Sequence, residues 1–210
     1  EIERKIAVIF ATDVVGYNPG KKERKMGQRG SETVSISLED VKLGHEDLIG
    51  DPSRGFSYAL EALEEGRLGI AAQALGIASA ALDEAVEYAD TRSQFGRVLR
   101  KFQGIEFKLG NMSARLEAGR GLIERAATAH MVGDPRARRL SSVAKLVASE
   151  TAVFATREAV QVFGGYGYSR EYPVERLFRD AKVTEIYEGA NEIHRSLIAR
   201  QLYRENENRV

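Results

Sequence analysis

The sequence predicts a mainly α protein, in which an antiparallel helical bundle follows a few β strands. Three observations predict this class. Residues 33–39 alternate polar and apolar side chains with a period of two, as in a half-buried strand. After the turn Gly50-Asp51-Pro52, apolar residues recur at spacings of three and four, as in amphipathic helices. In residues 102–123 they form a heptad-like stripe, which favours packing in an antiparallel bundle.

The chain before this turn is expected to be extended. Residues 5–10 form a short β-branched run, and the strand pattern of residues 33–39 follows a turn region rich in glycine and charge. We therefore predict a boundary at the turn, with residues 1–52 in a β domain and residues 53–210 in a helical domain. Because the chain starts at Glu1 and enters a strand pattern at once, we expect it to be part of a longer protein.

The first helix is expected to begin near Ser53, a residue type that often caps helices, and to run to about Ala89. Gly66, Gly69 and Gly76 lie inside it, and each costs about 1 kcal/mol relative to alanine. Small residues in a long apolar helix predict a close neighbour at these positions, either another helix or a ligand.

Further helices follow in order. The second carries the heptad-like stripe and ends at Gly133-Asp134-Pro135, and the third stops at Gly164-Gly165, where glycine serves as a C-terminal cap. A short helical piece is expected at residues 175–182. The last helix is predicted at residues 190–204, with a frayed polar tail from Glu205.

Composition argues against several classes of function. Lysine plus arginine and aspartate plus glutamate both count 31, and this zero net charge argues against nucleic acid or a membrane surface as the main partner. The sequence has no cysteine, which excludes disulfides, zinc–thiolate sites and thiol nucleophiles. His45, His130 and His194 follow no ligand spacing, so we expect no metal site. No apolar run reaches spanning length, so we expect no membrane partner.

The segment around Glu188 is the first candidate site. Glu188 directly precedes Gly189, and the residues that follow open a helical pattern. A loop-to-helix junction of this kind can direct a carboxylate into a cleft, while glycine lets a ligand approach the backbone closely and the free N–H groups of the next turn can hold a polar or anionic group. The alternative is a surface turn with a solvated glutamate, which the short motif alone favours.

Four separated stretches, taken together, resemble the C-terminal half of the flavin-dependent acyl-CoA dehydrogenases. Their order and separations match that family over essentially the whole chain. The early strands look like the end of the family's middle β domain, and the rest resembles its C-terminal four-helix bundle. The stretches are EEGRLG at residues 64–69, RSQFG at 92–96, QVFGGYGY at 161–168 and IYEG at 186–189.

The resemblance implies a chemistry. In this family a glutamate removes the α-proton of an acyl-CoA thioester while the β-hydrogen leaves as hydride to flavin N5, which gives a trans-2-enoyl-CoA. Glu188 matches that base. Some subgroups, such as the isovaleryl type, carry the base at the position of Gly66, which has no side chain in this sequence, and Glu64 and Glu65 lie on other helix faces. Raising the glutamate pKa from about 4.3 to about 7 would require roughly 3.7 kcal/mol, which desolvation can supply.

The resemblance also implies FAD and acyl-CoA contacts. The RSQFG motif matches one that reaches the FAD of a neighbouring subunit, although Arg92 could instead pair with Asp90 or cap a helix end. The segment 190–192 departs from the commoner threonine-serine-glutamine pattern and lacks its hydroxyl groups. The implied FAD contacts are Arg92, Gln94, Phe95, Gln103, Gln161, Val162, Phe163, Gly164, Gly165, Ala190, Asn191 and Glu192. The implied acyl-CoA contacts are Glu64, Arg67, Tyr187 and Gly189.

The prediction for the whole is an acyl-CoA dehydrogenase fragment with FAD as cofactor. The family implies a homodimer or homotetramer, electron-transferring flavoprotein as electron acceptor, and a cytoplasmic location in bacteria or the mitochondrial matrix in eukaryotes. Three alternatives remain at this point: an acyl-CoA oxidase of the same fold, a non-catalytic oligomerisation fragment, and a helical bundle unrelated to flavin. The last of these would require the four stretches to coincide by chance.

Overall fold

The computed structural model of the chain describes residues 23–31, 33–34, 42 and 44–207. The strand predicted at residues 5–10 lies outside these residues, as does that predicted at 33–39 except for Thr33 and Val34. The domain boundary at residue 52 stays a prediction. None of the described helices is both long and apolar enough to cross a membrane.

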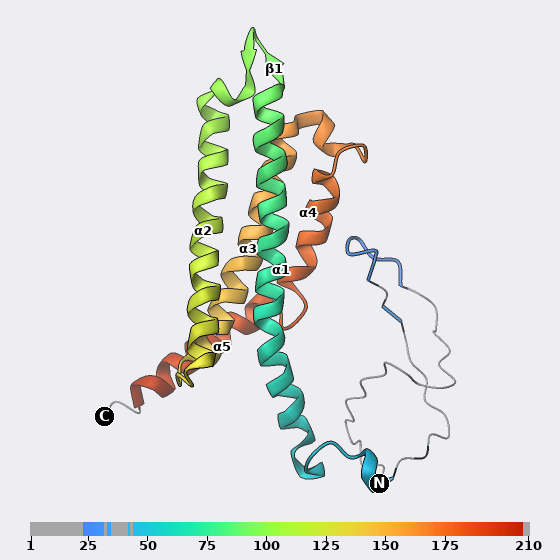
Figure 1. The fold of residues 1–210 in the computed structure, drawn as a ribbon, viewed down its shortest axis with the longest axis vertical. Coiled ribbons are helices and arrows are strands. Elements are labelled where there is room, and N and C mark those ends of the chain that lie inside the picture. The colour runs from blue at the N-terminus through green and yellow to red at the C-terminus, as the bar shows by residue number, and fades with distance from the viewer. Residues whose placement is uncertain (1–22, 32, 35–41, 43, 208–210) are drawn as a thin grey trace.

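Three long helices form the body of the molecule. Helix α1 (Gly55–Thr91) and α3 (Ala137–Phe163) run in the same direction, and α2 (Gln103–Met131) runs antiparallel to both (Figure 1). Helix α4 (Val174–Lys182) returns alongside α3, and α5 (Asn191–Glu207) lies across the end where α2 stops and α3 starts (Figure 1). The prediction of a mainly α helical bundle is confirmed.

The remaining regular structure is short. A two-stranded antiparallel hairpin joins α1 to the turn before α2, and single 3₁₀ turns flank the main helices. The strands are β1 (Ser93–Gln94) and β2 (Arg97–Val98), and the 3₁₀ turns are His45–Asp47, Pro52–Arg54, Leu99–Lys101, Gly164–Tyr168 and Val183–Glu185.

Alanine dominates the core between α1 and α3. Because a methyl side chain is short, the two helices can approach closely, and the interaxial distance depends on the side chains at the contact. Met112 and Leu116 of α2 pack into the same core. The fully or nearly fully buried alanines are Ala71, Ala74, Ala78, Ala81, Ala85 and Ala89 on α1 and Ala144, Ala148, Ala152, Ala155 and Ala159 on α3.

The start of α1 differs from the prediction. Ser53 does not cap the helix, because it lies inside the 3₁₀ turn Pro52–Arg54. The cap of that turn is Asp51, whose carboxylate accepts a hydrogen bond of 2.8 Å from the Ser53 backbone N–H. The proline at the first position of the turn lacks an N–H and suits this place. Helix α1 then begins at Gly55.

The expectation of close neighbours at three glycines of α1 holds for one of them. A methyl group added to Gly69 or Gly76 would have no atom of the described residues within 4 Å, so the expectation is wrong for the packing within this chain. The helix contact that does need glycine is on α2, where a Cβ at Gly119 would lie 2.8 Å from Leu75 Cδ2. Gly66 is discussed below, because its neighbour is a carboxylate.

The ends of α2 and α3 follow the prediction, and the end of α5 does not. Gly133 and Gly164 have φ of 67° and 61°, the left-handed region that favours glycine after a helix. The predicted fraying from Glu205 is wrong for the first residues of the tail, because α5 continues to Glu207. Arg139 of α3 donates two hydrogen bonds, of 2.7 and 2.9 Å, to the Glu205 carboxylate.

Candidate functional site

The loop that carries Glu188 has an unusual backbone. It joins the 3₁₀ turn Val183–Glu185 to α5, and both Glu188 (φ 52°) and Gly189 (φ 94°) have positive φ. Glycine adopts this conformation freely, but for a residue with a side chain it costs about 1–2 kcal/mol. Such a residue persists only where its surroundings hold it, and these positions cluster at functional sites.

The carboxylate of Glu188 lies directly over Gly66 of α1. A Cβ at position 66 would be 2.8 Å from Glu188 Oε2, closer than real Cβ contacts. The same oxygen is buried and has no hydrogen-bond partner among the described residues. A buried carboxylate oxygen without a partner is costly, so the site contains an acceptor that a ligand or a proton could satisfy.

A buried guanidinium lies near this carboxylate. The Arg67 side chain follows Gly66 on α1 and is only 7% exposed, and its Nε and Nη1 atoms have no hydrogen-bond partner among the described residues. Burial lowers the pKa of Arg67, partly offset by the negative charge of Glu64. Unpaired donors next to an unpaired acceptor indicate a binding site more than a packing contact.

A lysine from the middle of α3 donates hydrogen bonds to the segment that follows Glu188. Lys145 is fully buried, and its Nζ donates to the Gly189 carbonyl oxygen (2.7 Å) and to Asn191 Oδ1 (3.1 Å). The Ser149 hydroxyl donates to the same Asn191 oxygen at 3.0 Å. Burial lowers the Lys145 pKa to about 8, against the opposing effect of carboxylates led by Glu185.

A histidine from α5 supports the loop from the other side. His194 is fully buried, and its Nε2 lies 3.0 Å from the carbonyl oxygen of Glu188. Because a carbonyl only accepts, Nε2 carries the proton, and Nδ1 has no partner among the described residues. Burial, reinforced by the positive charge of Lys145, lowers the His194 pKa to about 4, so the ring is neutral near pH 7.

The other predicted acyl-CoA contacts lie around the same loop. The hydroxyl of Tyr187 donates to Gln73 of α1, and burial raises the pKa of this tyrosine. Glu64 pairs with Arg138 of α3 at 2.5 Å. Arg67, Tyr187 and Gly189 thus lie beside Glu188, whereas Glu64 is paired with Arg138.

The RSQFG motif forms the hairpin at the other end of α1. Its two turn residues, Phe95 (φ 52°) and Gly96 (φ 80°), both have positive φ, as in the two-residue turns that match the twist of paired strands. The Phe95 ring is 93% exposed at the tip. An aromatic side chain held out at a strained turn is available to an external partner.

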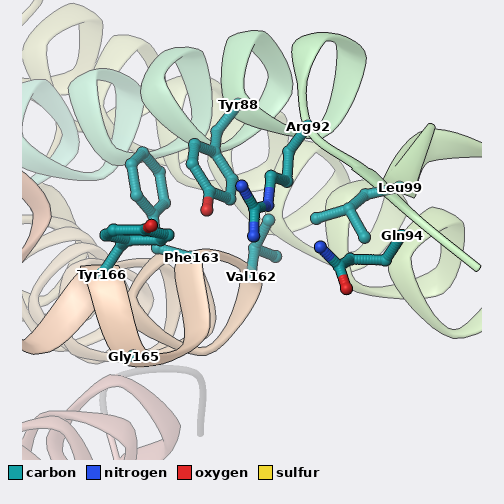
Figure 2. Close-up of a pocket in the computed structure, with 8 residues that line it drawn as sticks. All are labelled: Tyr88, Arg92, Gln94, Leu99, Val162, Phe163, Gly165 and Tyr166. Carbon is teal, nitrogen blue, oxygen red and sulfur yellow. The ribbon is translucent and has the colours of Figure 1, made fainter.

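A hollow of about 510 Å³ lies beside this hairpin. Figure 2 shows the side chains of Arg92 and Gln94 entering it from the end of α1 and from β1, opposite Val162, Phe163, Gly165 and Tyr166. The guanidinium of Arg92 lies 5.3 Å from the centre of the Tyr166 ring. It does not pair with Asp90, which pairs with Arg100 instead. Its backbone N–H does close α1, by donating to the Tyr88 carbonyl oxygen (2.9 Å).

The hollow brings together five of the predicted FAD contacts. They are Arg92, Gln94, Val162, Phe163 and Gly165. Four more of the predicted contacts are exposed and close in sequence to these five, but they do not line the hollow. They are Phe95, Gln103, Gln161 and Gly164. The remaining three, Ala190, Asn191 and Glu192, lie at the other site, where the Asn191 side chain faces inward to Lys145 and Ser149 and Glu192 is exposed.

The two sets are far apart. Gly66 and Arg92 lie on or next to α1 at positions separated by 26 residues, and at a rise of about 1.5 Å per residue this is roughly 39 Å. One extended dinucleotide cannot reach both sets within one chain.

Sequence reasoning missed the groups that hold the Glu188 loop. Lys145 interrupts the apolar stripe of α3, with Ser141 and Ser149 one turn away on each side, and this polar row on a buried face was the available signal. His194 was considered only as a metal ligand. Among the residues the structure describes, no group of three or more metal-ligating side chains is close enough to hold a metal ion.

Comparisons with known proteins give one family. Residues 53–203 match the model of the acyl-CoA dehydrogenase C-terminal domain. The chain is 50% identical over 187 residues to the short-chain specific acyl-CoA dehydrogenase of Megasphaera elsdenii, and this match covers 89% of the chain and 49% of that relative.

Two solved structures agree with this match. The butyryl-CoA dehydrogenase of Megasphaera elsdenii superposes with a TM-score of 0.86 at 49% identity, over 90% of this chain and 49% of that one. A chain in a structure described as electron transferring flavoprotein of Acidaminococcus fermentans superposes with a TM-score of 0.86 at 45% identity, over 89% of this chain and 49% of that one. The chain thus spans about half the length of the relatives it matches. It belongs to the acyl-CoA dehydrogenase family.

Proposed function

We propose that the protein containing this chain oxidises an acyl-CoA thioester to a trans-2-enoyl-CoA, with FAD as cofactor and Glu188 as the base. The observation that carries the proposal is the buried, unpaired Oε2 of Glu188 over Gly66. A carboxylate oxygen with a free lone pair can accept a proton, and the loop directs it to one place. A general base must be within hydrogen-bond reach of its proton, and such an orientation favours that.

In the proposed step Glu188 takes the α-proton of the thioester and becomes a neutral carboxylic acid. The electron pair of the broken α C–H bond forms the new bond between the α and β carbons. The flavin, when bound, supplies the oxidising power by accepting the β-hydrogen with its electron pair. Because position 66 has no side chain, nothing from α1 competes with Glu188 for the space.

The residues fit the proposed cofactor. Arg92 presents a guanidinium that is free of Asp90 beside a hollow lined by Gln94 and backbone-accessible Gly165, a combination suited to a pyrophosphate. Phe95 offers an exposed ring at the tip of the hairpin. Since this end lies roughly 39 Å from Gly66 along α1, we infer that the hairpin serves the FAD of a second copy, in a homodimer or homotetramer.

The substrate and the electron acceptor follow from the relatives and the Glu188 site. Arg67 has two unpaired donors next to Glu188 and suits a polar or anionic part of an acyl-CoA. The short-chain and butyryl-CoA names of the relatives make a four-carbon thioester the first substrate to test. Electron-transferring flavoprotein is the proposed acceptor, because one of the matching structures carries that name.

The experiment is anaerobic bleaching of the flavin in the purified protein. Glu188→Gln keeps the size of the side chain and removes the base, so we expect FAD to stay bound and butyryl-CoA to leave it oxidised. Glu117→Gln, the same change in an exposed side chain of α2 that pairs with Arg120, should bleach like the unaltered protein. Bleaching retained in Glu188→Gln would place the base elsewhere.

A further inference from the structure

We propose that Lys145 and His194 are positioning residues that fix the direction of the Glu188 carboxylate by holding two successive carbonyl groups of its loop. The proposal rests on the proposed function, because it assigns them a role in aiming the base. In this role neither side chain contacts the substrate or the cofactor. They act through the backbone.

The geometry is that of a clamp with one donor from each of two helices. Lys145 of α3 donates to the oxygen of Gly189 (2.7 Å), and His194 of α5 donates to that of Glu188 (3.0 Å). The direction of a carbonyl oxygen is set by ψ of its own residue. The two donors therefore fix ψ at Glu188 and at Gly189. The effect is largest at Gly189, because a glycine without this hydrogen bond could adopt a wide range of ψ values.

The clamp also holds the start of α5. The second bond of Lys145 goes to the side chain of Asn191, the first residue of that helix, and Ser149 donates to the same oxygen. The segment from 188 to 191 is thus held by three hydrogen bonds from α3 and by one from His194 of α5. A side chain with positive φ needs surroundings of this kind.

The charge of Lys145 is unusual for a purely structural role. An ammonium taken fully out of water is costly unless it is paired. The carboxylates that act on Lys145, led by Glu185, form no ion pair with it within the described part of the chain. A methionine could occupy similar space without a buried charge. What the ammonium adds is strong hydrogen bonding to the Gly189 carbonyl, so we infer that control of the loop is the reason for a cation at this position.

The test compares Lys145→Met with Lys108→Met in the FAD-loaded protein. Lys108 lies on α2, where it pairs with Glu158 and contacts nothing in the Glu188 loop, so it controls for the loss of a lysine. Single-turnover bleaching by butyryl-CoA gives the limiting rate and the Kd of the thioester separately. We expect the limiting rate to fall about 100-fold in Lys145→Met with Kd unchanged, because a displacement of about 1 Å can cost that much.

Hydrogen–deuterium exchange gives a readout that does not depend on turnover. We expect exchange in the peptide covering residues 185–195 to rise in Lys145→Met and to stay unchanged in Lys108→Met. A limiting rate and a loop exchange equal to those of the Lys108 control would overturn the proposal. If the unaltered protein is not bleached at all, the proposed function fails, while the exchange comparison still decides whether the clamp exists.

A second pair of variants covers the case in which Lys145→Met does not fold. His194→Gln can place its amide nitrogen near the site of Nε2 and donate to the Glu188 carbonyl, whereas His194→Phe fills the space without a donor. We expect His194→Gln to retain most of the limiting rate and His194→Phe to lose it about 100-fold, in line with the same displacement. Equal rates in the two variants would contradict a role for the donor.

Discussion

The two ends of α1 carry sites of opposite construction. At the Gly66 end the functional groups are buried, and Lys145 and His194 hold the loop from inside the chain. At the Arg92 end the Phe95 ring is exposed at the tip of the hairpin. Arg92 and Gln94 line the hollow beside it (Figure 2). Buried hydrogen bonds fix the first site, whereas the groups at the second site have only ring contacts, Arg92 with Tyr166 and Phe95 with Phe102.

This difference indicates which changes each site tolerates. Where a carboxylate is aimed by buried contacts, a small change in volume alters its direction, because packed interiors leave little free space. Where a guanidinium and a ring project outward, a substitution leaves the fold intact and weakens only what binds there. Substitutions at the Gly66 end should therefore act on the rate, and substitutions at the Arg92 end on cofactor affinity.

The largest expected effect in this comparison comes from Gly66→Ala. The added Cβ would be 2.8 Å from Glu188 Oε2, so the flexible end of that side chain has to move. We expect the fold to remain and the limiting rate of flavin bleaching to fall about 100-fold, since near-attack geometry is sensitive to such displacements. Stopped-flow bleaching by butyryl-CoA measures this.

Gly69→Ala is the matched control, with the same change about one turn later on the same helix. A Cβ there meets open space, so the bleaching rate should be unchanged. The free energy of unfolding should rise by up to about 1 kcal/mol, because alanine favours a helix over glycine. Equal rates in the two variants would show that the carboxylate does not need the space over residue 66.

Local periodicity in the sequence predicted the helices, and the resemblance of four separated stretches to one family predicted the candidate base. Periodicity of three and four residues predicted α1, α2 and α3, and glycine marked the ends of α2 and α3. The order of four short stretches singled out Glu188, and the structure places its carboxylate in a buried site over Gly66. These features depend on neighbours within a turn or on motifs that can be read directly.

The sequence did not predict the clamp or the hairpin, and the reason is physical. The Lys145–Gly189 hydrogen bond joins residues 44 positions apart, and no local pattern encodes such a pairing. The hairpin turn is Phe95-Gly96, and phenylalanine is not among the residues that normally signal a turn with positive φ at both positions. Tertiary contacts decide both features, so they become visible only once the helices are packed.

A smaller effect is expected from Arg92→Lys at the open end. Lysine keeps the positive charge but loses the planar fork that matches a pyrophosphate, so we expect the Kd for FAD to rise about 10-fold. The free energy of unfolding without FAD should change by less than about 0.5 kcal/mol, as for most surface substitutions. Flavin fluorescence titration and urea unfolding measure the two quantities.

Arg100→Lys serves as the control for this prediction. Arg100 lies at the same end but pairs with Asp90, and its side chain is outside the lining of the hollow. We expect it to bind FAD like the unaltered protein. A Kd that rises equally in both variants would mean that the effect is not specific to the guanidinium of Arg92, and a Kd unchanged in both would mean that this end acts only through its charge.

The smallest expected effect is the acid dependence of stability at the buried end. Burial and the charges of Lys145 and Arg67 lower the His194 pKa to about 4, below its unfolded value of about 6.5. Between these values the unfolded chain binds more protons, so the free energy of unfolding falls as pH falls. For this one group the loss between pH 7 and pH 5.5 is about 1 kcal/mol.

Urea titrations measure this effect in the unaltered protein and in His194→Gln, whose side chain does not titrate. The free energies of unfolding of the two proteins should converge by that amount at the lower pH. Parallel losses would mean that the ring is not held neutral in the folded protein.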